Sequence, residues 1–147
     1  MGRLGGFTLL ELIVVLVIMA LVYTLTLPAI STLFPGVELK GATRQISAGL
    51  RKARSRAVTI KQESTLTLDV EQKHFSVSGD QKTYSIPSDL DLNLKTARSE
   101  QLSAEVGSIR FYPDGSSTGG TITLTSGELE YTVDVNWLTG QVMVVNN

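Results

Sequence analysis

An unbroken apolar run close to the N-terminus constrains this chain more than any other feature of its sequence. The run extends from Phe7 to Leu27 and contains one charged residue, Glu11. Its length of roughly 20 residues is what an α-helix needs to cross the hydrocarbon core of a bilayer. The sequence therefore predicts a transmembrane helix over residues 7–30.

The residues before this run do not follow the pattern of a secretory signal, which loses its apolar core on cleavage. Here the small residue Gly6 precedes the core. Cleavage after Gly6 would remove a leader of residues 1–6 and leave the helix on the mature protein. It would also create an amino group on Phe7, about one helical turn from Glu11. Because a charge in an apolar helix is costly in a membrane, we expect Glu11 to pair with that amine or with the amine of a neighbouring chain.

The segment Gly6-Phe7-Thr8-Leu9-Leu10-Glu11 resembles the N-terminal signature of the type IV pilin family, which includes the pseudopilins of type II secretion. The resemblance implies that a membrane-bound prepilin peptidase cuts between Gly6 and Phe7 and then methylates the new amino group of Phe7. It also implies that Glu11 directs assembly into a helical filament. Pro28 is similar to the family's proline at the end of the apolar segment.

A second helix is predicted over residues 31–62. After the interruption at Phe34-Pro35-Gly36, apolar residues recur at steps of three and four, at Leu39, Ala42, Ile46, Leu50, Ala53, Ala57 and Ile60. This stripe predicts an amphipathic helix that packs on a sheet and continues the first helix into a globular domain.

The opposite face of this helix is basic, with Lys40, Arg44, Arg51, Lys52, Arg54, Arg56 and Lys61. The face is either solvated or contacts a partner, acidic lipid heads or DNA. For DNA, the best phosphate contacts would be Arg51, Lys52, Arg54 and Arg56. A solvated face is the favoured interpretation, because acids elsewhere balance the bases and no aromatic residues lie among them.

Residues 63–147 are predicted to form a β domain. Alternation of apolar and polar residues indicates strands at 65–70, 74–77, 83–86, 90–94, 109–111, 121–124, 131–135 and 141–145. The segment 95–107 has no clear period and is expected to be a surface loop. The predicted fold class is α+β and pilin-like, with a long N-terminal (transmembrane) helix packed on two antiparallel sheets or on one split sheet.

A second motif lies in the C-terminal part of the chain. Phe111-Tyr112-Pro113-Asp114-Gly115 leads through Gly119-Gly120 into a strand, and Thr139-Gly140-Gln141-Val142 follows. This arrangement resembles the minor pseudopilin H and FimT group. The calcium-binding loop of the major pseudopilin has no counterpart that we can place.

Composition and site chemistry argue against an enzyme. The chain has 13 basic residues, 14 acidic residues and no cysteine, so its net charge does not predict nucleic-acid binding and no disulfide can form. The single histidine, His74, is expected to be an exposed strand residue. Asp89 and Asp91 supply too few oxygen ligands for a calcium site, and Gly115–Gly120 lacks the lysine of a phosphate-binding loop. We therefore expect no catalytic residue, no metal and no cofactor, while Trp137 is either a core anchor or an exposed contact.

These features and resemblances predict a minor pseudopilin of a type II secretion system that assembles into the periplasmic pseudopilus and drives export of folded proteins. The expected partners are other minor and major pseudopilins, the prepilin peptidase, the inner-membrane secretion platform and the secreted substrate; nucleic acid is not expected. The expected location is the inner membrane of a Gram-negative bacterium, single-pass, with the C-terminal domain in the periplasm. The alternative is a FimT/FimU-like minor pilin of type IV pili, acting in assembly or DNA uptake.

Overall fold

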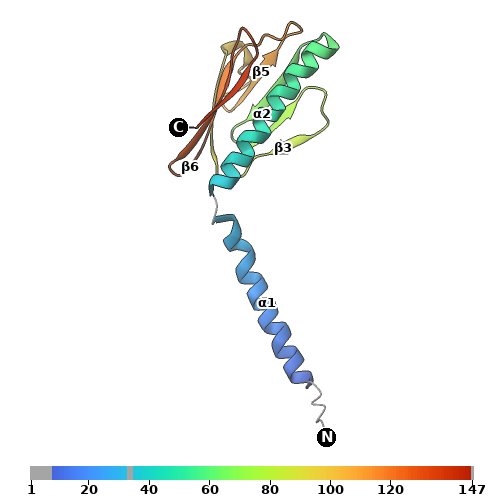
Figure 1. The fold of residues 1–147 in the computed structure, drawn as a ribbon, viewed down its shortest axis with the longest axis vertical. Coiled ribbons are helices and arrows are strands. Elements are labelled where there is room, and N and C mark those ends of the chain that lie inside the picture. The colour runs from blue at the N-terminus through green and yellow to red at the C-terminus, as the bar shows by residue number, and fades with distance from the viewer. Residues whose placement is uncertain (1–7, 33–34, 147) are drawn as a thin grey trace. The chain divides into compact units, whose positions relative to one another are not determined.

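The computed structural model describes residues 8–32 and 35–146, and the side chains of residues 8–24 and 36–146. The chain divides into two compact units, residues 1–35 and 36–147 (Figure 1). The first unit contains helix α1 (Leu9–Thr32). The second contains nearly all of helix α2 (Pro35–Ile60) and the β-strands.

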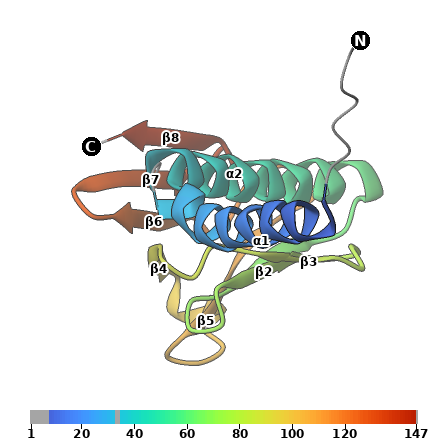
Figure 2. The same cartoon turned by 90° about the horizontal axis from the view of Figure 1, so that it is seen from below.

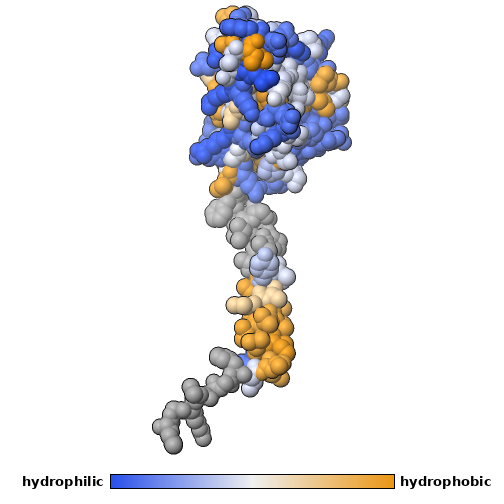
Figure 3. Space-filling model, turned by 90° about the vertical axis from the view of Figure 1, so that its right-hand side faces the viewer, coloured by the Kyte–Doolittle hydropathy of each residue, from blue (hydrophilic) through white to orange (hydrophobic). Residues whose placement is uncertain are grey.

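Helix α1 is apolar on all of its sides. From Leu9 to Tyr23 its large apolar side chains are between 46% and 76% exposed, and this stretch is the orange segment of Figure 3. The helical backbone runs past Pro28, as the sequence predicts, and α1 ends at Thr32, two residues beyond the predicted range of 7–30. Among the residues that the structure describes, no helix is both long enough and apolar enough to cross a membrane.

Helix α2 is amphipathic, as its sequence predicts. Pro35 occupies the first helical position, where its missing N–H leaves no bond unmade. The apolar stripe is almost completely buried, at Leu39, Ala42, Ile46, Leu50, Ala53 and Ala57. The prediction for Ile60 is wrong, because this side chain is 40% exposed. It is the last residue of the helix, and the chain turns away at Lys61, where φ is +57°.

The strands form two four-stranded antiparallel sheets, which confirms the α+β fold class in its two-sheet version. The first sheet has the order β3 (Thr83–Ser85), β2 (His74–Val77), β1 (Ser64–Asp69), β5 (Val106–Phe111). The second has the order β4 (Asp91–Thr96), β6 (Gly120–Ser126), β7 (Leu129–Val135), β8 (Val142–Asn146). Figure 2 shows α2 lying across the view, with the labelled strands of the second sheet toward its left end and those of the first sheet below it.

The core lies between α2 and the two sheets. Each sheet directs alternate apolar residues toward the helix, including Leu66, Leu68, Phe75, Ile109 and Phe111 from the first sheet and Ile122, Leu124, Val133 and Val135 from the second. Gly49 lets the helix approach closely, since a Cβ atom there would lie 2.8 Å from the Phe75 ring. The ring of Phe75 stacks on Tyr84 with 5.0 Å between centroids.

The segment 95–107 is more ordered than a surface loop. Strand β4 continues to Thr96, a 3-10 turn η1 spans Arg98–Glu100, and β5 already begins at Val106. The Glu100 side chain is buried and accepts hydrogen bonds from the Ser108 hydroxyl at 2.9 Å and from Arg110 Nε at 3.2 Å. Periodicity misses this segment, because polar contacts of Glu100 to β5 hold the turn in place and polar contacts leave no apolar repeat in the sequence.

Candidate functional site

The N-terminal signature begins helix α1. The Thr8 hydroxyl oxygen accepts a hydrogen bond from the backbone N–H of Glu11 at 3.3 Å, and the Thr8 carbonyl accepts one from Leu12 at 3.2 Å. Thr8 is therefore the N-cap, and the spacing from Thr8 to Glu11 is that of a capping box. The predicted cleavage residues Gly6 and Phe7 lie outside the described residues.

Glu11 is exposed in the first turn of α1. An acidic side chain in that position interacts favourably with the partial positive charge of the helix N-terminus. Its backbone N–H is used by the cap, while its carboxylate is directed to the outside of a helix whose neighbouring side chains are apolar. The backbone N–H of Glu11 thus has a local role that any residue except proline could fill, whereas its negative charge comes from the side chain.

The C-terminal motif forms two turns. In the first, the Gly115 N–H donates to the Tyr112 carbonyl at 2.9 Å, and Asp114 accepts bonds from the N–H and the hydroxyl of Ser116. The Ser116 hydroxyl bond, followed by the backbone bond, lowers the pKa of Asp114. Gly115 has φ of +88°, a value that favours glycine.

The second turn joins β7 to β8. The Asn136 side-chain oxygen accepts bonds from the N–H groups of Leu138 and Thr139, and the Asn136 carbonyl accepts one from Gly140. Gly140 has φ of +63°. A Cβ atom on Gly140 would overlap the carbonyl oxygen of Gly115, so the two turns are in direct backbone contact.

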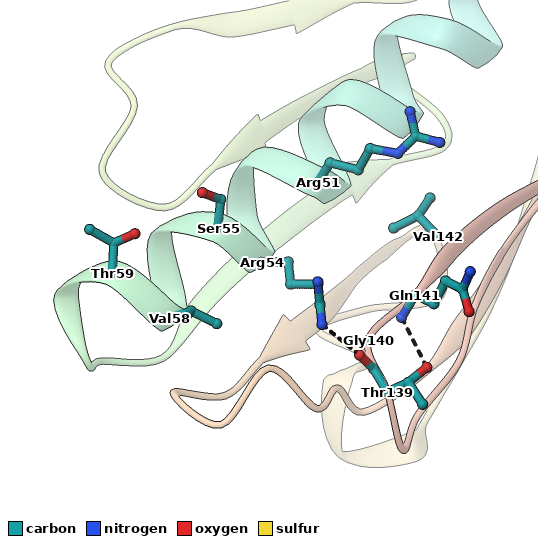
Figure 4. Close-up of a pocket in the computed structure, with 9 residues that line it drawn as sticks. All are labelled: Arg51, Arg54, Ser55, Val58, Thr59, Thr139, Gly140, Gln141 and Val142. Atoms are coloured by element: carbon teal, nitrogen blue, oxygen red, sulfur yellow. Dashed lines mark hydrogen bonds between the residues drawn. The ribbon is translucent and has the colours of Figure 1, made fainter.

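Arg54 of α2 joins these turns to the helix. Its Nε donates to the Gly115 carbonyl at 3.1 Å. Its Nη2 donates to the Thr139 carbonyl at 2.9 Å, the bond that Figure 4 draws. One guanidinium thus satisfies a carbonyl in each turn. Arg54 is one of the four residues that would contact phosphate if the basic face bound DNA, but in the structure two of its donors are used within the fold. The sequence offers no local signal for this, since the partners lie 61 and 85 residues away.

A hollow of about 750 Å³ lies beside this contact. Figure 4 shows its lining from α2 on one side and from the β7–β8 turn and the start of β8 on the other. Its lining residues are mostly polar, including Arg51, Ser55, Thr59, Thr139 and Gln141. Among the described residues, no histidine or acidic side chain lines it.

The other residues of the predicted basic face have varied surroundings. Lys52 forms an ion pair with Asp80 at 2.6 Å, and that hydrogen bond raises the pKa of Lys52 and lowers the pKa of Asp80. The guanidinium of Arg56 lies against Gly79. Two of the four proposed phosphate contacts, Lys52 and Arg54, therefore have partners inside the domain.

Asp89 and Asp91 do not form a common site. Asp91 begins β4 and lies opposite Thr125, while Asp89 lies beside Glu38 in the first turn of α2. In the described part of the chain, no group of three or more histidine, aspartate or glutamate side chains is placed to hold a metal ion. The negative charge of Asp89 raises the pKa of Glu38, with smaller contributions from burial and from a hydrogen bond to Asp89.

We expect the substitution Asp89→Asn to lower the pKa of Glu38 toward its ordinary value, because it removes the like charge that opposes ionisation. Because the pKa of Glu38 is raised in the folded state, repulsion between Glu38 and Asp89 lowers the stability of the fold at pH values above the ordinary pKa of a glutamate. This destabilisation disappears as the pH falls and Glu38 becomes protonated. NMR titration of the Glu38 side-chain carbon measures the shift. Asp91→Asn is the matched control and should leave the titration unchanged; equal shifts in both variants would contradict the assignment.

Comparison with known proteins finds family matches for both the N-terminal signature and the globular domain. Residues 42–140 match the family described as "Type II transport protein GspH", and residues 1–25 match the prokaryotic N-terminal methylation motif. A protein of Xanthomonas campestris pv. campestris named "Type II secretion system protein H" is 33% identical over 140 residues, which cover 95% of this chain and 82% of that protein. The chain belongs to the GspH family.

Solved structures agree on the fold. The minor pseudopilin EpsH from the type 2 secretion system of Vibrio cholerae has a TM-score of 0.60 at 12% identity, covering 74% of this chain and 97% of that one. The type IV minor pilin FimU of Pseudomonas aeruginosa has a TM-score of 0.58 at 17% identity, covering 76% and 91%. The pilin-like fold is therefore common to both kinds of system.

The segment that matches the GspH family includes the Arg54 contact. Its range, residues 42–140, begins within α2 and ends at Gly140, so it contains Arg54 and both glycine turns. The C-terminal motif that identifies the group in the sequence is therefore the part of the β domain that this arginine holds to α2. In this GspH protein the motif therefore has a structural role, because it connects the β domain to α2 through Arg54.

Proposed function

We propose that this GspH protein is a minor pseudopilin of a type II secretion system, which assembles into the periplasmic pseudopilus and drives export of folded proteins. The observation that carries the proposal is the match to a type II secretion protein H over nearly the whole chain. Assembly is the proposed role of the chain, and catalysis is not.

Helix α1 is the proposed membrane and filament segment. A helix that is apolar on every side requires an apolar environment all around it. The apolar run of roughly 20 residues in the sequence supports single-pass insertion in the inner membrane, with the C-terminal domain in the periplasm. In the assembled pseudopilus, neighbouring copies of the same kind of helix would replace lipid around the large side chains from Leu9 to Tyr23.

Processing and assembly are proposed for the N-terminal signature. The methylation motif over residues 1–25 supports cleavage by the prepilin peptidase between Gly6 and Phe7 and methylation of the Phe7 amine. Glu11 would then pair with the amine of an adjoining subunit and set the axial position of the incoming helix. The proposed partners are the other minor and major pseudopilins, the inner-membrane secretion platform and the secreted substrate.

Deletion of the gene in its host tests the function. We expect export of type II substrates to be lost and restored by a plasmid copy, while pilus-dependent motility is unchanged. Measuring exoprotein activity in the culture supernatant and twitching on agar separates this function from that of a minor pilin. Normal export together with lost motility would overturn the proposal and favour the FimU-like alternative.

A further inference from the structure

Strand β8 is an edge strand whose side chains are mostly exposed. It lies at the end of its sheet next to β7, and in the described part of the chain no strand lies on its other side. Met143, Val144 and Val145 are 44%, 43% and 48% exposed. An apolar edge with unpaired backbone groups is a template for another strand. Natural edges are usually protected, and β8 has neither a proline nor a lysine to protect it.

The register shows which backbone groups of β8 are free. The Asn136 N–H donates to the Gln141 carbonyl at 3.0 Å, so Asn136 and Gln141 form a hydrogen-bonded pair. In an antiparallel ladder such pairs alternate with non-bonded pairs. Val142 and Val144 therefore direct their N–H and C=O groups away from β7, toward the open edge.

Basic residues of α2 lie along this strand. Lys40, Arg44 and Arg51 line a hollow of about 330 Å³ together with Tyr131 and Val144. Arg51 also lines the larger hollow beside Val142, so the two hollows follow one seam between α2 and β8. Figure 2 shows α2 and β8 along this side of the domain. We call this surface, Lys40, Arg44, Arg51, Val142 and Val144, the α2–β8 seam.

Among the described residues, no acidic side chain forms an ion pair with a base of the seam. Ion pairs within the described residues involve Lys52 with Asp80, and Arg110 with Glu63 and Glu100. Lys40, Arg44 and Arg51 are exposed and take part in none of them. The seam therefore combines outward backbone donors and acceptors of β8, the side chains of Val142 and Val144, and three positive charges.

We propose that the α2–β8 seam binds an extended acidic segment of another pseudopilin subunit, which adds as a strand to β8 and places carboxylates opposite Lys40, Arg44 and Arg51. The identity of the partner rests on the proposed function, whereas the chemistry of the segment does not. Strand addition requires a peptide, because only a peptide backbone complements the free N–H and C=O groups of Val142 and Val144. Positive side chains beside that edge select carboxylates.

The test measures peptide binding to the purified full-length protein in nanodiscs. The probe is a short synthetic peptide in which glutamate alternates with valine, and the matched control peptide has lysine in place of glutamate. Fluorescence anisotropy gives the affinity, and NMR amide shifts locate the site. We expect the glutamate peptide to bind and to shift amides of β8, and the lysine peptide to bind at least tenfold more weakly, which is what three exposed charge pairs can supply.

Two variants separate the charges from the backbone. Lys40→Glu, Arg44→Glu and Arg51→Glu together should weaken the glutamate peptide about tenfold, whereas Lys95→Glu on the opposite edge strand β4 should leave binding unchanged. Val144→Pro removes one outward N–H without removing a bond to β7. It should weaken binding of the glutamate peptide even though Lys40, Arg44 and Arg51 are unchanged.

Absence of binding by the glutamate peptide, equal binding to the triple variant, or amide shifts on β4 instead of β8 would each overturn the proposal. None of these results would affect the proposed function, because the gene deletion tests export separately.

Discussion

Replacing Gly140 with alanine should lower the free energy of unfolding by about 2–5 kcal/mol, the sum of backbone strain and steric overlap. Gly140 has φ of +63°, where an L-residue is strained, and its Cβ would overlap the Gly115 carbonyl oxygen. Relief of that overlap should move one turn away from the other, so that Arg54 can no longer bond to both. Thermal unfolding followed by circular dichroism should show a melting temperature lower by on the order of 10 °C.

Gly127 provides a matched control for this prediction. It has a similar φ of +60°, but no heavy atom beyond its own chain neighbours lies within 4 Å of the position of its Cβ. Gly127→Ala therefore introduces the backbone strain without the overlap and should cost only about 1–2 kcal/mol. If both alanine variants lose the same stability, the contact between the two turns is not important for the domain.

Local periodicity in the sequence accounts for most of the fold. Six of the seven stripe residues of α2 are buried, and each strand predicted from alternation has a counterpart in one of the two sheets. Helices and strands can be predicted in this way because burial of one face requires apolar residues at the helical or strand period. The prediction for Ile60 is wrong because the helical period does not show at which residue the helix ends.

Contacts between distant residues could not be predicted in this way. Arg54 in the sequence is one base among seven on a helix face, and only the fold brings it to the carbonyls of Gly115 and Thr139. Glu100 lies in a segment without periodicity, and it is held by Arg110 on β5. A polar side chain carries no sequence pattern that tells whether its partner is water or a carbonyl many residues away. Trp137 shows the same limit, since its 66% exposure excludes a core role.

At both ends of the chain, the family resemblance identified features that periodicity does not show. The residues that carried it are the N-terminal signature up to Glu11 and the two glycine turns, and membership of the GspH family is now confirmed. The turns could be recognised because positive φ and close backbone approach restrict their residue types. Their connection to α2 through Arg54 was visible only in the structure.

Substituting Glu11 with leucine should reduce export of type II substrates by an order of magnitude or more, while the protein still inserts in the membrane. Export is measured in the deletion strain complemented at native expression. The substitution keeps the backbone N–H that bonds to Thr8, so the helix start is retained. It removes the one carboxylate available to pair with the Phe7 amine of a neighbouring subunit. A charge pair in apolar surroundings is worth far more than one in water, so loss of the pair should be felt in assembly rather than in folding.

Thr8→Ala separates the charge from the cap. It removes the hydroxyl that accepts the Glu11 N–H, at a cost of about 1 kcal/mol for an N-cap, and leaves the carboxylate in place. Export should then be nearly normal. Mass spectrometry of the mature N-terminus should show cleavage between Gly6 and Phe7 and a methylated Phe7 in both variants, so that any difference in export arises after processing. Normal export by Glu11→Leu would contradict the pairing, and an equal loss in Thr8→Ala would assign the effect to the helix cap.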